Sequence, residues 1–204
     1  SEWTIGDVLS HLGSGAQIMC ETLQARLEGR ELDQQHHRHI WDVWNAKTDT
    51  DRARDRYEHD HRLLDRLASV PTEQHRQLRF RMGPMDLDFG TFVGMRLNEH
   101  VVHTWDIDVA TDPAATLLAG AIPHILEHLA MIAGFAGRPD GTERDLTIAT
   151  TNPTRQFQLT TTVTTITLTQ LDAATTPEPA GDVTTEVTVE ADVERFDEAD
   201  QEIS

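Results

Sequence analysis

Hydrophobic residues in the first half of the chain recur at the spacing of amphipathic helices. Over residues 4–27 they fall every three or four positions, which places them on one side of a helix. The same spacing predicts a short helix around residues 40–44 and longer helices over 50–67 and 89–110. The helix over 89–110 is apolar around much of its circumference, so we expect it to be the central and most buried helix. Together these segments predict a small up-and-down helical bundle.

Polar stretches separate these helices. Residues 30–39 are polar and rich in histidine, and we expect a loop there. Residues 70–88 contain two prolines and a glycine, so we expect a long connection. The bundle is predicted to end at a polar turn over 111–113, because the proline at its end disfavours a helix at the residue before it.

After this turn the hydrophobic period changes from that of a helix to that of strands. Residues 114–136 carry one more apolar helical stripe, and Pro123, early within it, is a candidate for the true start of the helix. Alternation with period two then predicts strands at Leu146 and Ile148, at Phe157, Leu159 and Val163, at Ile166 and Leu168, and over 183–189. The phase slips between Val163 and Ile166, which predicts a bulge or turn at 164–165.

These periods predict the fold class and the domain organisation. The chain is expected to be α+β, with a helical bundle over residues 1–112 and a smaller α+β domain over 113–204. The tail from residue 192 onward is acidic and is expected to be weakly helical at most.

Composition narrows the possible partners. The 204 residues include 35 acids and 17 bases, for a formal net charge of −18, so we expect neither a nucleic-acid partner nor an anionic membrane surface. No apolar run reaches 18 residues and no signal peptide opens the chain, which favours a cytoplasmic protein. The single cysteine, Cys20, rules out a disulfide framework and a Cys-rich zinc site, and we expect a buried structural thiol.

The helix over 89–110 carries the strongest candidate chemistry. Glu99 and His103 are four residues apart, so their side chains lie one turn apart on one face, where a carboxylate and an imidazole can hold two corners of a zinc tetrahedron. A third ligand must come from another helix, and His11 is the best candidate. Arg96 and Asp106 extend the same stripe at three-residue spacing.

Spacing alone leaves other interpretations open. With 35 acids and 11 histidines, several such pairs arise by accident. His124 and His128 form a rival pair, and a histidine cluster lies at residues 36–39. The Glu99–His103 pair is equally compatible with a buried hydrogen bond or with a solvated helix face.

Two segments resemble a known family. The segment from Trp3 to Leu12 is similar to the Trp-Thr-x-x-Asp-x-x-x-His-Leu segment of mycothiol-dependent maleylpyruvate isomerase-like proteins, which are DinB-like metal-binding helical bundles. The segment from Glu99 to Ile107 resembles the Glu-x-x-x-His-x-Trp-Asp segment of that family. The resemblance implies a bundle followed by a smaller α+β domain.

The resemblance also implies a site and its chemistry. It assigns His11, Glu99 and His103 as ligands of a divalent metal, with zinc the first choice, and mycothiol as the thiol that the metal activates toward an electrophilic small molecule. Asp106 is then a candidate acceptor that orients the His103 ring, although it is also compatible with an exposed carboxylate. Arg96 is a candidate partner of Glu99 or of an anionic substrate, with a surface position as its alternative. A monomer or a homodimer is expected.

Three departures from the family keep several functions open. The family usually has a helix before the Trp-Thr segment, so we expect a longer natural chain or a partner that covers the exposed face. The Trp-Gly-Arg-like segment of the family's C-terminal domain does not occur in the last 60 residues, and Thr104 stands where a basic residue is common. A mycothiol-dependent transferase or isomerase, a metal-dependent hydrolase that uses bound water, and a non-enzymatic metal- or ligand-binding protein are therefore weighed together.

Overall fold

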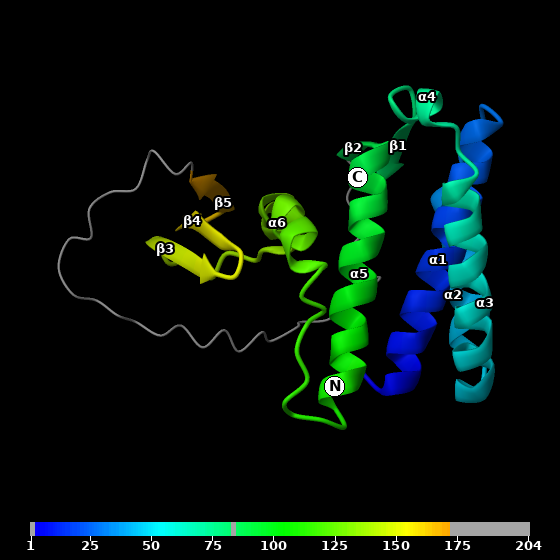
Figure 1. Cartoon of the computed structure of the whole chain (residues 1–204), viewed down its shortest axis with the longest axis horizontal. Coiled ribbons are helices and arrows are strands. Elements are labelled where there is room, and N and C mark those ends of the chain that lie inside the picture. Colours follow the sequence, from blue (N-terminus) through cyan, green and yellow to red (C-terminus); the bar gives the residue numbers. More distant parts are fainter. Residues whose placement is uncertain (1–2, 83–84, 172–204) are drawn as a thin grey trace. The chain divides into compact units, whose positions relative to one another are not determined.

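A computed structural model describes residues 3–82 and 85–171 of the chain (Figure 1). Its helices are α1 (Ile5–Leu27), α2 (Gln34–Asn45), α3 (Asp49–Ala68), α4 (Thr72–His75), α5 (Phe89–Val109) and α6 (Ile122–Ala136). Its strands are β1 (Arg79–Met82), β2 (Met85–Asp88), β3 (Arg144–Thr151), β4 (Thr154–Thr161) and β5 (Ile166–Leu171). The strand predicted over 183–189 and the acidic tail lie outside the described residues.

The long helices begin at side chains that cap them. Thr4 accepts a hydrogen bond from the backbone N–H of Asp7, and the Asp7 carboxylate accepts one from the backbone of Thr4, so both ends of a capping box are present. Thr48 and Asp88 cap α3 and α5, and the side chain of each accepts a hydrogen bond from the backbone N–H three residues later. These caps satisfy N–H groups that have no partner inside the helix, and they fix where each helix starts.

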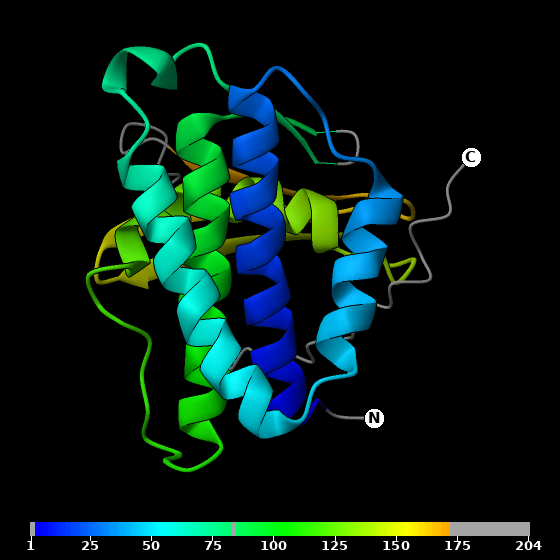
Figure 2. The same ribbon diagram turned by 90° about the vertical axis from the view of Figure 1, so that its right-hand side faces the viewer.

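The central and most buried helix of the bundle is α1, not α5 as the apolar pattern predicted. It packs against α2, α3 and α5, and runs between them (Figure 2). Trp44 of α2 is fully buried against it and donates a hydrogen bond from its indole N–H to Gln17 of α1 at 2.8 Å. Gly13 permits this approach, since a Cβ at that position would overlap the Trp44 ring. The predicted helical bundle is thus confirmed.

One apolar core lies where α1 and α5 meet the hairpin of β1 and β2. It consists of buried residues from the helices, the hairpin and the connection before it, which are Leu23, Val70, Leu78, Phe80, Leu87, Phe89 and Phe92. Phe80 stacks on Phe92 with ring centroids 3.9 Å apart. This core anchors the start of α5, the helix that also carries Glu99 and His103.

Three predicted boundaries were wrong. Residues 30–39 are not a loop throughout, because Asp33 caps α2 and the helix starts at Gln34, so the histidines at 36–39 are helical. The connection at 70–88 contains α4 and the β1–β2 hairpin, whose short strands alternate apolar and polar residues between the proline and glycine residues that favoured a connection. The helix predicted from residue 114 begins at Ile122 instead, and Pro123 in its first turn confirms the alternative start that this proline indicated.

The C-terminal described part is a three-stranded antiparallel sheet with strand order β3-β4-β5. Residues 162–165 connect β4 to β5, as the phase slip at 164–165 predicts. The helix α6 packs against β5, and Phe157 and Leu168 are buried. An α+β fold is therefore confirmed, whereas the domain boundary at residue 112 stays a prediction. Among the described residues, no helix is both long and apolar enough to span a bilayer.

Candidate metal centre

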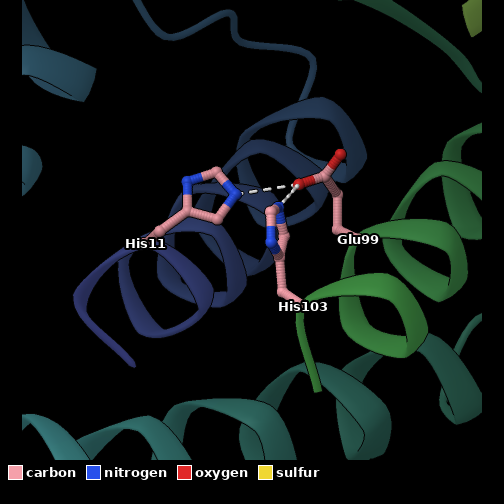
Figure 3. A group of neighbouring side chains, drawn as sticks. All are labelled: His11, Glu99 and His103. Atoms are coloured by element: carbon pink, nitrogen blue, oxygen red, sulfur yellow. Dashed lines mark hydrogen bonds and ion pairs between the residues drawn. The ribbon is translucent and has the colours of Figure 1, made fainter. Parts of the chain in front are cut away.

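Three side chains from two helices converge in the bundle (Figure 3). His11 comes from α1, and Glu99 and His103 come from α5. Nε2 of His11 lies 2.8 Å from Oε2 of Glu99, and Nε2 of His103 lies 3.4 Å from the same oxygen. The three ligand atoms all lie within 4.8 Å of one another. Within residues 3–82 and 85–171, no other group of three or more His, Cys, Asp or Glu side chains converges in this way.

The fold explains this convergence. Glu99 and His103 share a face of α5 because they are one helical turn apart. The contact of α1 with α5 brings His11 onto that face from a position less than two turns after the Thr4 cap. The positions that sequence spacing and resemblance selected are therefore brought together in space.

Charge and hydrogen bonding determine the protonation of the site without a metal. Burial acts to raise the pKa of Glu99, but hydrogen bonds from His103 and His11 outweigh it and hold that pKa well below its ordinary value. Burial acts to lower the pKa of His103, but its hydrogen bonds to Glu99 and Asp106 prevail and raise it. Glu99 is thus an ionised carboxylate, the state in which it can bind a cation.

Asp106 is the partner that orients His103. Nδ1 of His103 donates to Oδ2 of Asp106 at 2.7 Å, which leaves Nε2 facing Glu99. A second hydrogen bond of this kind fixes the ring and the tautomer of a metal-binding histidine. This contact favours the orienting role over the alternative of an exposed helix carboxylate.

Trp3 is a neighbour of the site to which sequence spacing assigned no role. Its ring centroid lies 5.2 Å from that of His11 and 6.0 Å from that of His103, nearly parallel to the latter at 22°. The indole therefore covers the imidazoles directly before the start of α1. A periodicity search could not find it, because Trp3 precedes the helix.

The three residues fit a divalent cation. Two ligand atoms about 2.1 Å from a tetrahedral zinc ion are about 3.4 Å apart, which is the separation between His103 and Glu99. The His11–Glu99 pair is closer, because a hydrogen bond joins it, and it opens by about half an ångström in that geometry. Two imidazole nitrogens and one carboxylate oxygen are a donor set typical of catalytic zinc sites.

Arg96 neither pairs with Glu99 nor lies on the surface. It is buried, and its guanidinium pairs with Asp60 of α3. Arg56 approaches the same carboxylate at 3.5 Å. The reason is tertiary, since α3 presents Asp60 to the face of α5 that carries Arg96. Arg96 thereby links α5 to α3 one turn before Glu99.

The rival candidates do not form comparable sites. His36 pairs with Glu21 at 2.5 Å, and His124 lies 3.8 Å from Glu127 in an exposed pair on α6. Neither pair belongs to a group of three converging ligands among the described residues. Burial raises the pKa of the Cys20 thiol, which opposes the formation of a reactive thiolate there.

Comparison with known proteins places the helical part in a family. Residues 1–108 match the family model described as the mycothiol maleylpyruvate isomerase N-terminal domain. The chain belongs to this family. The match includes His11, Glu99, His103 and Asp106, and ends before α6 and the sheet. Searches of curated proteins and of solved structures find no significant match.

Proposed function

We propose that this member of the mycothiol maleylpyruvate isomerase N-terminal domain family is a divalent-metal-dependent enzyme that activates a thiol, with zinc as the metal and mycothiol as the thiol. The supporting observation is the convergence of His11, Glu99 and His103 in a chain of that family. The reaction class is transfer or isomerisation, in which the thiol adds to an electrophilic small molecule.

The charge of the site suits this chemistry. One carboxylate and two neutral imidazoles carry a net charge of −1, so a bound divalent cation leaves the cluster at +1. A divalent cation held there stabilises the deprotonated form of a thiol that binds beside it, and so supplies a nucleophile at neutral pH. Three protein ligands leave a position for such a group, whereas structural zinc sites use four.

The chain's own residues hold this arrangement in place. Asp106 keeps the proton of His103 on Nδ1, so Nε2 is available as a ligand. Trp3 packs against the two imidazoles and limits how far their rings can turn. The Arg96–Asp60 pair fixes α5 against α3 beside Glu99.

Metal binding is tested by removing one ligand. We expect a chelator to lower the melting temperature of the wild-type protein and to leave that of His103→Ala unchanged, since a ligand that binds only the folded state stabilises it. His124→Ala is the matched control, because His124 is an exposed histidine outside the site, and it should respond as the wild type does. Equal chelator sensitivity in His103→Ala and wild type would place the metal elsewhere.

The thiol is tested on metal-loaded protein. We expect mycothiol to stabilise it by about 2.7 kcal/mol at a hundredfold excess over its dissociation constant. The effect should vanish in His103→Ala and be smaller with simple thiols. If millimolar mycothiol has no effect on metal-loaded protein, the thiol-dependent function is refuted. Hydrolysis by bound water and non-enzymatic ligand binding are then the functions to assay.

A further inference from the structure

A cleft with a strongly positive lining lies at the opposite end of α1 from the metal centre. It is formed by the last turn of α1, the segment that follows, α2 and β1. The charged and titratable side chains that line it are Arg26, Arg30, Arg79, Arg81, His37 and Glu31. Arg26 is fifteen residues after His11 on one helix, or about 22 Å at 1.5 Å per residue, so this cleft is separate from the metal centre.

The concentration of arginine is unusual for this protein. The chain has a formal net charge of −18 and 17 basic residues, yet four guanidinium groups and only one carboxylate line the cleft. That carboxylate belongs to Glu31, which is 69% exposed and lies 4.0 Å from Arg26. The cleft is therefore a local positive potential in an acidic molecule, and it concentrates anions.

Two of the four guanidinium groups remain available. Arg30 pairs with Glu28, and Arg79 pairs with Asp86 at 3.0 Å. Arg81 forms no ion pair with any described residue, and the contact of Arg26 with Glu31 is at the limit of an ion pair. An anion that bridges Arg26 and Arg81 would give these two guanidinium groups the partner that the described residues do not supply.

A histidine supplies an independent observation. Nε2 of His37 is buried and has no hydrogen-bond partner among the described residues. Buried polar atoms nearly always have a partner, and an exception requires an explanation. His37 lines the cleft, so an oxygen atom of a bound ligand explains why the protein leaves this nitrogen unpaired.

The volume of the cleft limits the ligand. It is about 60 Å³, and one water molecule needs about 10–15 Å³ on this measure. The space is therefore that of about five heavy atoms, which is the size of one phosphate group. Guanidinium groups bind phosphate oxygens in pairs, so several arginines around a small space favour this anion over a monovalent one.

We propose that the cleft binds a phosphate group through Arg26, Arg81 and His37. The group is either inorganic phosphate or the terminal phosphate of a small phosphorylated molecule. The ligand chemistry is the same in both cases, and the site does not depend on a metal at His11, Glu99 and His103.

The test measures phosphate binding to the full chain at constant ionic strength. We expect inorganic phosphate to raise the melting temperature more than chloride does. Arg26→Gln and Arg81→Gln should each lower the affinity for phosphate about tenfold, which is the effect of losing one charge-assisted contact. Arg155→Gln is the control, since this exposed arginine of β4 makes the same change in net charge far along the chain from the cleft. It should bind phosphate as the wild type does.

The two sources of the group are distinguished with methyl phosphate. Tighter binding of methyl phosphate than of inorganic phosphate indicates a phosphorylated molecule, and the reverse indicates the free ion; both agree with the proposal. Equal responses to chloride and phosphate overturn the proposal. It is also overturned if Arg155→Gln loses as much phosphate affinity as Arg26→Gln and Arg81→Gln do. Unchanged affinity in His37→Ala contradicts the proposed three-residue site.

Discussion

Asp106→Ala offers a sharp test of how the metal centre is built. Asp106 accepts the Nδ1–H hydrogen bond of His103 at 2.7 Å and pairs with neither of the other two proposed ligands. Its removal leaves all three ligands in place but frees the His103 ring to rotate and to move its proton to Nε2. Metal affinity should therefore fall although no ligand is lost.

The structure sets the size of this effect. Loss of such an orienting partner costs about 10–100-fold in metal affinity, which is about 1.4–2.7 kcal/mol. Only 15% of the His103 side chain is exposed, so water replaces the lost carboxylate poorly. Asp106 itself is 25% exposed, and solvent screens part of its charge. We therefore expect about a thirtyfold loss for Asp106→Ala. Asp106→Asn, which keeps an acceptor oxygen but no charge, should lose less.

The assay is a competition titration of zinc between the protein and a chelating indicator at pH 7.5. Asp108→Ala is the matched control, because Asp108 is an exposed carboxylate two residues later on the same helix. It should leave the affinity unchanged. If Asp106→Ala binds zinc within twofold of the wild type while His103→Ala does not, Asp106 has no orienting role.

Two further predictions concern the packing that positions the site, and chemical denaturation measures both. Gly13→Ala should destabilise the protein by about 1–2 kcal/mol, because the cost of overlap with the buried Trp44 ring exceeds the gain of about 1 kcal/mol in helix propensity. Gly134→Ala is the control. A Cβ at that position has no neighbouring atom within 4 Å, so this change should be neutral or stabilising. A more stable Gly13→Ala protein would contradict this packing. Arg96→Met should lower the free energy of unfolding by about 3 kcal/mol. This is the lower end for a broken buried pair, because Arg56 still lies beside Asp60. Adding Asp60→Asn should restore part of the lost stability. Additive losses in the double variant would show that the two side chains do not interact.

Local regularities made part of this structure predictable. The i, i+4 spacing of Glu99 and His103 fixes their common face once α5 is a helix, and the apolar pattern identifies α5. His11 is different, because nothing in the spacing along one helix selects a residue on another. It was the best candidate because it is a lone imidazole in the otherwise apolar early part of the first helix, and the family resemblance then assigned it as a ligand.

Features that depend on contacts distant in sequence were not predictable in this way. The Arg96–Asp60 pair joins residues 36 positions apart, and no periodicity links them. The hairpin of β1 and β2 does carry a period-two pattern, with apolar residues at 78, 80 and 82 and at 85, 87 and 89. It was missed because the strands are short and the prolines and glycine around them favoured a connection. The start of α2 was missed because the Asp33 cap precedes a run of polar residues rather than an apolar stripe.

The placement of the ligands on two helices has a consequence for function. Because α1 supplies His11 and α5 supplies both Glu99 and His103, one interhelical relation determines the geometry of the whole centre. The cap at Thr4, the Arg96–Asp60 pair and the apolar core at the start of α5 all act on that relation, and all lie within the matched residues 1–108. Neither α6 nor the sheet supplies a ligand. Metal binding should thus be a property of the bundle, so a variant that alters the sheet can change which small molecule is accepted without changing zinc affinity.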